Sequence, residues 1–163
     1  ITEADPGNVV AAANLALAHA SSGRMMVAEQ MLRRLVHKAP DDAHVHFSFA
    51  SVLESKGDPG SVREAVSHLE KALRHDPNMW EAACDLGRLL VTQAGIQNVP
   101  RGISLLEQVR GQAGDRPEVL LNLAIAYAHA GRSAEAKAAC SQVLADPSRP
   151  DLHEQAGKLA AQI

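Results

Sequence analysis

Residues 43–77, which read AHVHFSFASVLESKGDPGSVREAVSHLEKALRHDP, decide the fold. Apolar side chains recur every three or four positions on both sides of Gly57, which predicts two amphipathic helices joined by a turn. Ser61 and Glu64 have the spacing of a capping box at the start of the second helix. Pro77 closes the segment, because proline cannot continue a helix. The stretch therefore predicts one helical hairpin.

Versions of this hairpin precede it and follow it. Pro6, Pro40 and Pro77 lie 34 and 37 residues apart, and a period of this size is typical of stacked helical repeats. The first six residues resemble the segments that end at Pro40 and Pro77, so we expect the chain to be part of a longer array. We predict one solenoid domain over residues 1–163. Its parts are the tail of a preceding repeat (1–7), four repeats (8–40, 41–77, 78–114 and 115–147) and a terminal capping helix or start of a fifth repeat (150–163).

The composition excludes several classes of protein. Hydrophobic residues make up 46% of the chain and aromatic residues only 2%, which suits an Ala- and Leu-rich helical protein. A net charge of −3 gives no electrostatic basis for binding nucleic acid. No apolar run approaches the roughly 20 residues of a membrane span, so we expect no direct membrane insertion. Cys84 and Cys140 lack CxxC spacing and are interpreted as buried thiols, which leaves a cytoplasmic and a periplasmic location open.

The residues that could carry chemistry form no recognisable constellation. The chain has no Gly-rich phosphate loop, no GxSxG elbow and no HExxH pair, so we expect no catalytic residues, no cofactor and no enzyme activity. Eight histidines raise the question of a metal site. His44 and His46 are two positions apart and point to different sides of a helix, and His68 and His75 are interpreted as surface residues. We therefore predict no metal site.

The four units resemble the tetratricopeptide repeat, a helix–turn–helix of 34 residues with apolar and small residues at fixed positions. The resemblance covers nearly the whole chain and implies an all-α, right-handed superhelical solenoid of antiparallel helix pairs. Small residues at two positions of each unit would let the paired helices approach closely. The Ala-rich style is similar to that of bacterial repeat proteins that organise secretion, pilus, envelope or polysaccharide machineries. The matching residues are Leu15, Ala16 and Ala28; Phe49, Ala50 and Ala65; Leu86, Gly87 and Gly102; and Leu123, Ala124 and Ala136.

The resemblance also implies a binding face. In the family, the first helix of each pair lines a concave groove that receives an extended peptide or a partner helix. Carried over by register, the groove would also include Ala13, Ser48, Cys84 and Leu121 along its length. The residues predicted to bind the partner are Asn14, Leu17, Phe47, Ser51, Glu54, Glu81, Asp85, Arg88, Asn122 and Ile125.

The predicted groove is apolar at its first end and acidic in its middle. Phe47, Ser51 and Glu54 lie where the two parts meet and form the predicted centre of contact. A partner segment with apolar and basic character would complement this face. The sequence thus predicts a non-enzymatic protein–protein interaction scaffold for assembly of a larger complex. Two alternatives stay open: a targeting or regulatory arm of a larger enzyme, and a scaffold that self-assembles through the end faces of its repeats.

Overall fold

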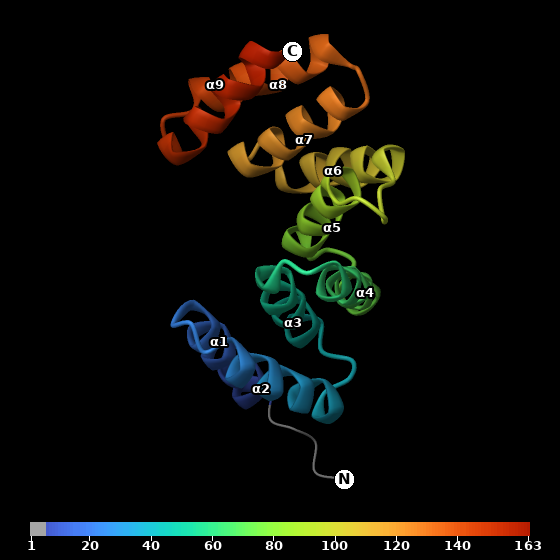
Figure 1. Ribbon diagram of the computed structural model, residues 1–163, viewed down its shortest axis with the longest axis vertical. Helices are drawn as coiled ribbons and strands as arrows, with labels where there is room; N and C mark the ends of the chain where they lie inside the picture. The colour runs from blue at the N-terminus through green and yellow to red at the C-terminus, as the bar shows by residue number, and fades with distance from the viewer. Residues whose placement is uncertain (1–5) are drawn as a thin grey trace. The chain divides into compact units, whose positions relative to one another are not determined.

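A computed structural model describes residues 6–163, and these residues form helices joined by short connections, with no strand among them (Figure 1). The predicted all-α fold is confirmed. The elements are α1 (Pro6–Ser21), α2 (Met25–Lys38), α3 (Ala43–Lys56), α4 (Pro59–His75), α5 (Trp80–Thr92), α6 (Val99–Ala113), α7 (Pro117–His129), α8 (Ser133–Ala145), the 3-10 helix η1 (Pro150–Leu152) and α9 (His153–Gln162).

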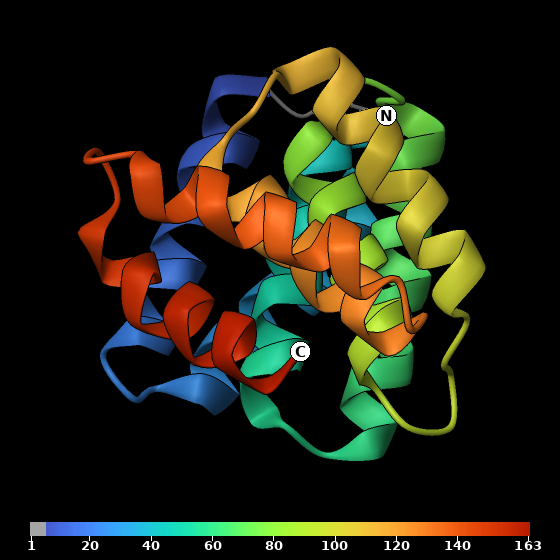
Figure 2. The same ribbon diagram turned by 90° about the horizontal axis from the view of Figure 1, so that it is seen from above.

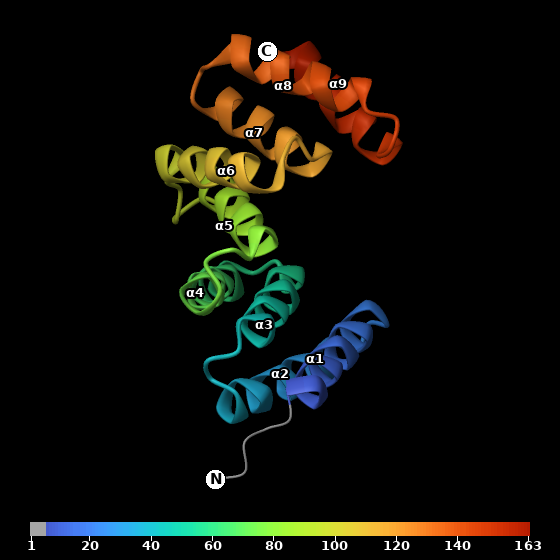
Figure 3. The same cartoon turned by 180° about the vertical axis from the view of Figure 1, so that it is seen from behind.

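The chain divides into two compact units, Ile1–Ala82 and Ala83–Ile163. In the first unit, α1 packs against α2 and α3 packs against α4, each pair antiparallel, and α3 also contacts α1 and α2 (Figure 1). In the second unit, α6 packs against α7, and α7 packs against α8 (Figure 3). Consecutive helices therefore form hairpins within each unit, as the repeat period predicts. That the two units make one solenoid domain stays a prediction.

Aspartates begin the two helices of the pair that decided the fold. The Asp42 carboxylate accepts a hydrogen bond of 3.0 Å from the backbone N–H of Val45, and Asp58 accepts one of 2.9 Å from that of Ser61. These bonds satisfy N–H groups that have no partner within the helix. The helix α4 consequently begins at Pro59, with Asp58 as its N-cap, and the prediction that Ser61 caps this helix is wrong.

The core of the first unit lies between its helix pairs. Leu32 of α2, Phe49 and Leu53 of α3, and Leu69 of α4 are fully buried. The guanidinium of Arg33 on α2 lies over the Phe49 ring, 5.2 Å from its centroid. The face of α3 that carries Phe49 is therefore covered by the second helix of the preceding pair.

Helices α5 and α6 approach each other closely at two glycines. A Cβ atom built at Gly102 would lie 2.6 Å from Val91 Cγ2 and 2.8 Å from the Gly87 carbonyl oxygen. A Cβ at Gly87 would lie 2.8 Å from Leu106 Cγ. Real Cβ atoms do not come so close, so only hydrogen fits at both positions. The prediction that small residues set this approach is confirmed.

Helix α9 covers the end of the last pair. It lies alongside α8 (Figure 2), and buries Ala156 against a cluster that includes Leu120, Cys140 and Val143. Burial raises the pKa of the Cys140 thiol, as expected for an inert structural cysteine. Across residues 6–163, no helix combines the length and apolarity that crossing a membrane requires.

Candidate functional site

The predicted binding residues of the first unit lie on two helices in contact. Asn14 and Leu17 belong to α1, while Phe47, Ser51 and Glu54 belong to α3. The spacing of the α3 residues places them on one helix face. Phe47, Ser51 and Glu54 are half-buried, so part of each remains accessible, and Asn14 is exposed. The Ser51 hydroxyl donates a hydrogen bond of 3.2 Å to the Phe47 carbonyl oxygen.

Phe47 also lines a cavity with the beginning of α5. This cavity has a volume of about 260 Å³ and lies entirely within the first unit. Two of its lining residues belong to α3, three lie in the turn after α4, and two lie in the first turn of α5. The structure therefore brings together Phe47 and Glu81, which sequence register assigned to the same groove from different repeats. The lining residues are His44, Phe47, Asp76, Asn78, Met79, Trp80 and Glu81.

The predicted residues of the second unit lie on α5 and α7. Arg88 and Asp85, one helical turn apart on α5, approach to 3.5 Å. The side-chain amide of Asn122 on α7 donates a hydrogen bond of 3.1 Å to the Cys84 sulfur on α5. Ile125, one turn along α7, packs against the apolar cluster under α9. The structure thus joins α5 and α7 directly, whereas a single groove running through both units stays a prediction.

Four further positions expected along the groove are buried. Ala13, Ser48, Cys84 and Leu121 lose almost all their accessible surface to neighbouring side chains. They pack helices against each other instead of presenting atoms to a ligand. The residues available for contact are the half-buried and exposed ones between them.

A histidine pair at the core of the α3–α4 hairpin was not predicted. His68 is only 6% exposed, so its interpretation as a surface residue is wrong. Its Nδ1 lies 2.8 Å from Nδ1 of His46, and Nε2 of His46 lies 2.8 Å from the Pro40 carbonyl oxygen. Because a carbonyl oxygen only accepts, His46 Nε2 carries the proton in the neutral ring. His46 Nδ1 then accepts the hydrogen bond that His68 Nδ1–H donates.

The surroundings of this pair favour its neutral form. The His75 ring stacks on His46 at 5.9 Å between centroids, and Phe49 lies 4.5 Å from His68 by the same measure. Burial lowers the pKa of His46, and it lowers the pKa of His68 to about 4 with help from nearby positive charge. Among residues 6–163, no three His, Cys, Asp or Glu side chains are grouped to hold a metal ion. The pair is best understood as a hydrogen-bonded part of the core.

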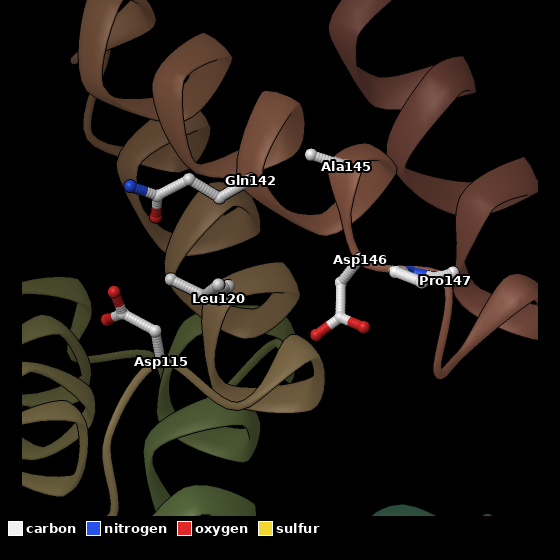
Figure 4. Close-up of a pocket in the computed structure, with 6 residues that line it drawn as sticks. All are labelled: Asp115, Leu120, Gln142, Ala145, Asp146 and Pro147. Atoms are coloured by element: carbon white, nitrogen blue, oxygen red, sulfur yellow. The ribbon is translucent and has the colours of Figure 1, made fainter.

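A second cavity lies between the start of α7 and the end of α8 in the second unit. Its volume is about 440 Å³, and Figure 4 shows the side chains of Asp115 and Asp146 on either side of Leu120. Arg110 donates a 2.5 Å hydrogen bond to Asp115 and thereby lowers the pKa of that carboxyl group. No aromatic side chain lines this cavity. The lining residues are Asp115, Leu120, Gln142, Ala145, Asp146 and Pro147.

Comparison with known families identifies the repeat. Residues 97–163 match the family model described as tetratricopeptide repeat. Residues 97–163 carry tetratricopeptide repeat sequence. For this part of the chain, the match confirms the family predicted from the pattern of apolar and small residues. No curated protein matches the chain in sequence.

Solved structures with the tetratricopeptide fold resemble the whole chain. MamA (residues 41 to end) from Desulfovibrio magneticus RS-1 has a TM-score of 0.73 and 19% identity, over 99% of this chain and 94% of that one. PilW, a type IV pilus biogenesis factor, has a TM-score of 0.80 and 15% identity, over 98% and 72% of the two chains. A thermophilic tetratricopeptide repeat protein of Thermus thermophilus has a TM-score of 0.75 and 18% identity, over 96% and 81%. At these identities the likeness establishes the fold.

Proposed function

We propose that this tetratricopeptide repeat chain is a non-enzymatic scaffold that binds a peptide or helix of a partner protein through the first helices of its pairs. The observation that carries the proposal is the cavity in which Phe47 of α3 and Glu81 of α5 meet. A preformed surface of packed helices loses little backbone entropy on binding, so shape and charge decide the partner. PilW is a pilus biogenesis factor, and assembly of a larger complex is the corresponding role proposed for this chain.

Charge indicates the partner's character. Among the predicted binding residues, Glu54, Glu81 and Asp85 carry three negative charges, and Arg88 carries one positive charge. Complementary charge accelerates encounter and rejects partners of the wrong sign. A segment with apolar side chains and basic residues is therefore the proposed ligand.

Selection of peptides from a random display library tests this function. We expect enriched peptides to be apolar and basic, and to bind more weakly as salt is raised. The double variant Glu81→Lys, Asp85→Lys should lose at least about tenfold in affinity and reverse the salt dependence. The matched control is Glu64→Lys, Glu70→Lys, which changes the net charge equally on α4, a second helix. Equal losses in the two double variants would contradict binding by the first helices.

One observation favours self-association as a second function. Leu15 of α1 is 53% exposed, whereas residues at its repeat position, Phe49, Leu86 and Leu123, are at most 1% exposed. The Arg33 side chain of α2 helps to cover Phe49, and no helix among residues 6–163 precedes α1 to cover Leu15 in the same way. Met26 of α2 is 75% exposed, which adds apolar surface to this pair. Sedimentation should show concentration-dependent association that Leu15→Glu abolishes; a monomer at every concentration would exclude it.

A further inference from the structure

We propose that the cavity between α3 and the start of α5 is an anchor site for one arginine side chain of the partner. This inference rests on the proposed scaffold function and names the residue that the partner must supply. Aromatic rings, a buried methionine and two carboxylates line the cavity, and each of these features bears on what it can hold.

The size of the cavity suits a single side chain. Its volume of about 260 Å³ lies below the roughly 300–1,000 Å³ of sites that enclose a whole small molecule. Met79, which is buried, contributes apolar surface to the lining. An extended peptide lying across α3 could insert one long residue here while its backbone stays outside. The dimensions therefore favour one residue of a polypeptide over a free metabolite.

The aromatic rings that line the cavity favour a flat cation. The half-buried Phe47 and Trp80 and the exposed His44 bring three aromatic rings to the lining. Positive charge is attracted to the faces of aromatic rings, most strongly to tryptophan. A guanidinium group can stack on a ring and still use its edge for hydrogen bonds, which an ammonium group cannot do.

The carboxylates supply the matching charge. Asp76 Oδ1 accepts a hydrogen bond of 3.0 Å from the Asn78 backbone N–H, which holds this side chain in position. Glu81 is exposed in the first turn of α5. Within residues 6–163, neither Asp76 nor Glu81 forms an ion pair, and no lysine or arginine lines the cavity. Two carboxylates and three aromatic rings thus line the same cavity, and its lining contains no basic counter-charge from lysine or arginine. The second cavity has carboxylates but no aromatic wall, and so serves as an internal control.

Trp80 makes the site directly observable, because it is the chain's single tryptophan. The experiment titrates the full chain with N-acetyl-L-arginine amide and follows the indole N–H signal of Trp80 by NMR. N-acetyl-L-citrulline amide is the control ligand, since it has nearly the same shape without the charge. We expect a saturable shift with the arginine compound and binding at least about fivefold weaker with the citrulline compound.

Two variants test whether the shift of the Trp80 signal comes from binding in this cavity. Glu81→Gln should weaken binding of the arginine compound about threefold or more and leave the citrulline compound unaffected. Asp146→Asn, which removes a carboxylate from the second cavity, should leave both titrations unchanged. Equal binding of the two compounds, no saturable shift of the Trp80 signal, or no effect of Glu81→Gln would overturn the arginine site.

The anchor site and the scaffold function can fail separately. Library-selected peptides that bind without moving the Trp80 signal would overturn the arginine anchor and leave the scaffold intact. Saturable binding of the arginine compound, with no peptide selected from the library, would retain the site and overturn the scaffold.

Discussion

The α3–α4 pair and the α5–α6 pair solve the same packing problem in different ways. At the two small-residue positions, α3–α4 has Ala50 and Ala65, both buried, while α5–α6 has Gly87 and Gly102. The first pair has room for a Cβ atom at each position. The second does not, because a Cβ at Gly102 would overlap Val91.

The polar content of the two pairs differs as well. Where α3–α4 buries the hydrogen-bonded His46 and His68, register places Ala83 and Leu105 in α5–α6. An apolar contact between helices keeps its strength at any pH. A histidine pair with one donor and one acceptor requires both rings to be neutral. We therefore expect the stability of the α5–α6 pair to depend on side-chain volume and the stability of the α3–α4 pair to depend on pH.

Gly102→Ala should produce the largest loss of stability, because it forces apart the closely packed helices α5 and α6. We expect a loss of about 3 kcal/mol of unfolding free energy, at the upper end for overpacking, because the Gly87 backbone oxygen cannot rotate away. Urea denaturation followed by circular dichroism measures it. Gly111→Ala on the same helix is the control: a Cβ there meets no atom within 4 Å, so alanine should stabilise by about 0.5–1 kcal/mol. Similar values for both variants would contradict the close approach.

Acidification should produce the next largest effect and acts on the α3–α4 pair. The pKa of His68 is about 4 in the folded chain, below the value near 6.5 of an unfolded one, so the unfolded state binds more protons. The stabilisation from the neutral ring is complete above pH 6.5 and is lost as the pH falls toward 4. We expect a loss of about 2–3 kcal/mol over this range, measured by denaturation at a series of pH values.

The control for the pH effect is a variant in which the two buried histidines of α3–α4 are replaced by the residue types of α5–α6. His46→Ala, His68→Leu installs the residue types of α5–α6 and should remove most of the dependence between pH 6.5 and 4. The positive and negative groups around the pair, Arg33, Asp42, Lys71 and His75, are unchanged in this variant. His37→Gln, at an exposed histidine of α2, should keep the dependence. An unchanged pH profile in the double variant would show that other groups cause it.

The sequence predicts the helix-contact positions of the two pairs better than it predicts their buried polar groups and caps. The period of small residues identified Ala65 and Gly102 as contact positions, because close packing allows few alternatives there. It did not identify His68, since a lone histidine beside charged neighbours looks like a surface residue, and its partner is 22 positions away. The N-cap Asp58 was missed because Ser61 is an equally good cap; Pro59 in the first helical turn was the deciding signal. The binding face stays a prediction, because it depends on surfaces from both units.

Ala65→Leu tests the α3–α4 pair, which has room for a Cβ atom. It should give the smallest of the three losses of unfolding free energy. Ala65 is fully buried between α3 and α4, so three added heavy atoms must displace neighbours, at a cost of about 1–2 kcal/mol. This is less than for Gly102→Ala, because side chains around Ala65 can change rotamer where a backbone oxygen cannot. Ala138→Leu, at an exposed position of α8, is the matched control and should change the unfolding free energy by less than about 0.5 kcal/mol. An unchanged denaturation midpoint for Ala65→Leu would mean that the small position of this pair is not a point of helix contact, and the register that equates Ala65 with Gly102 would then be wrong.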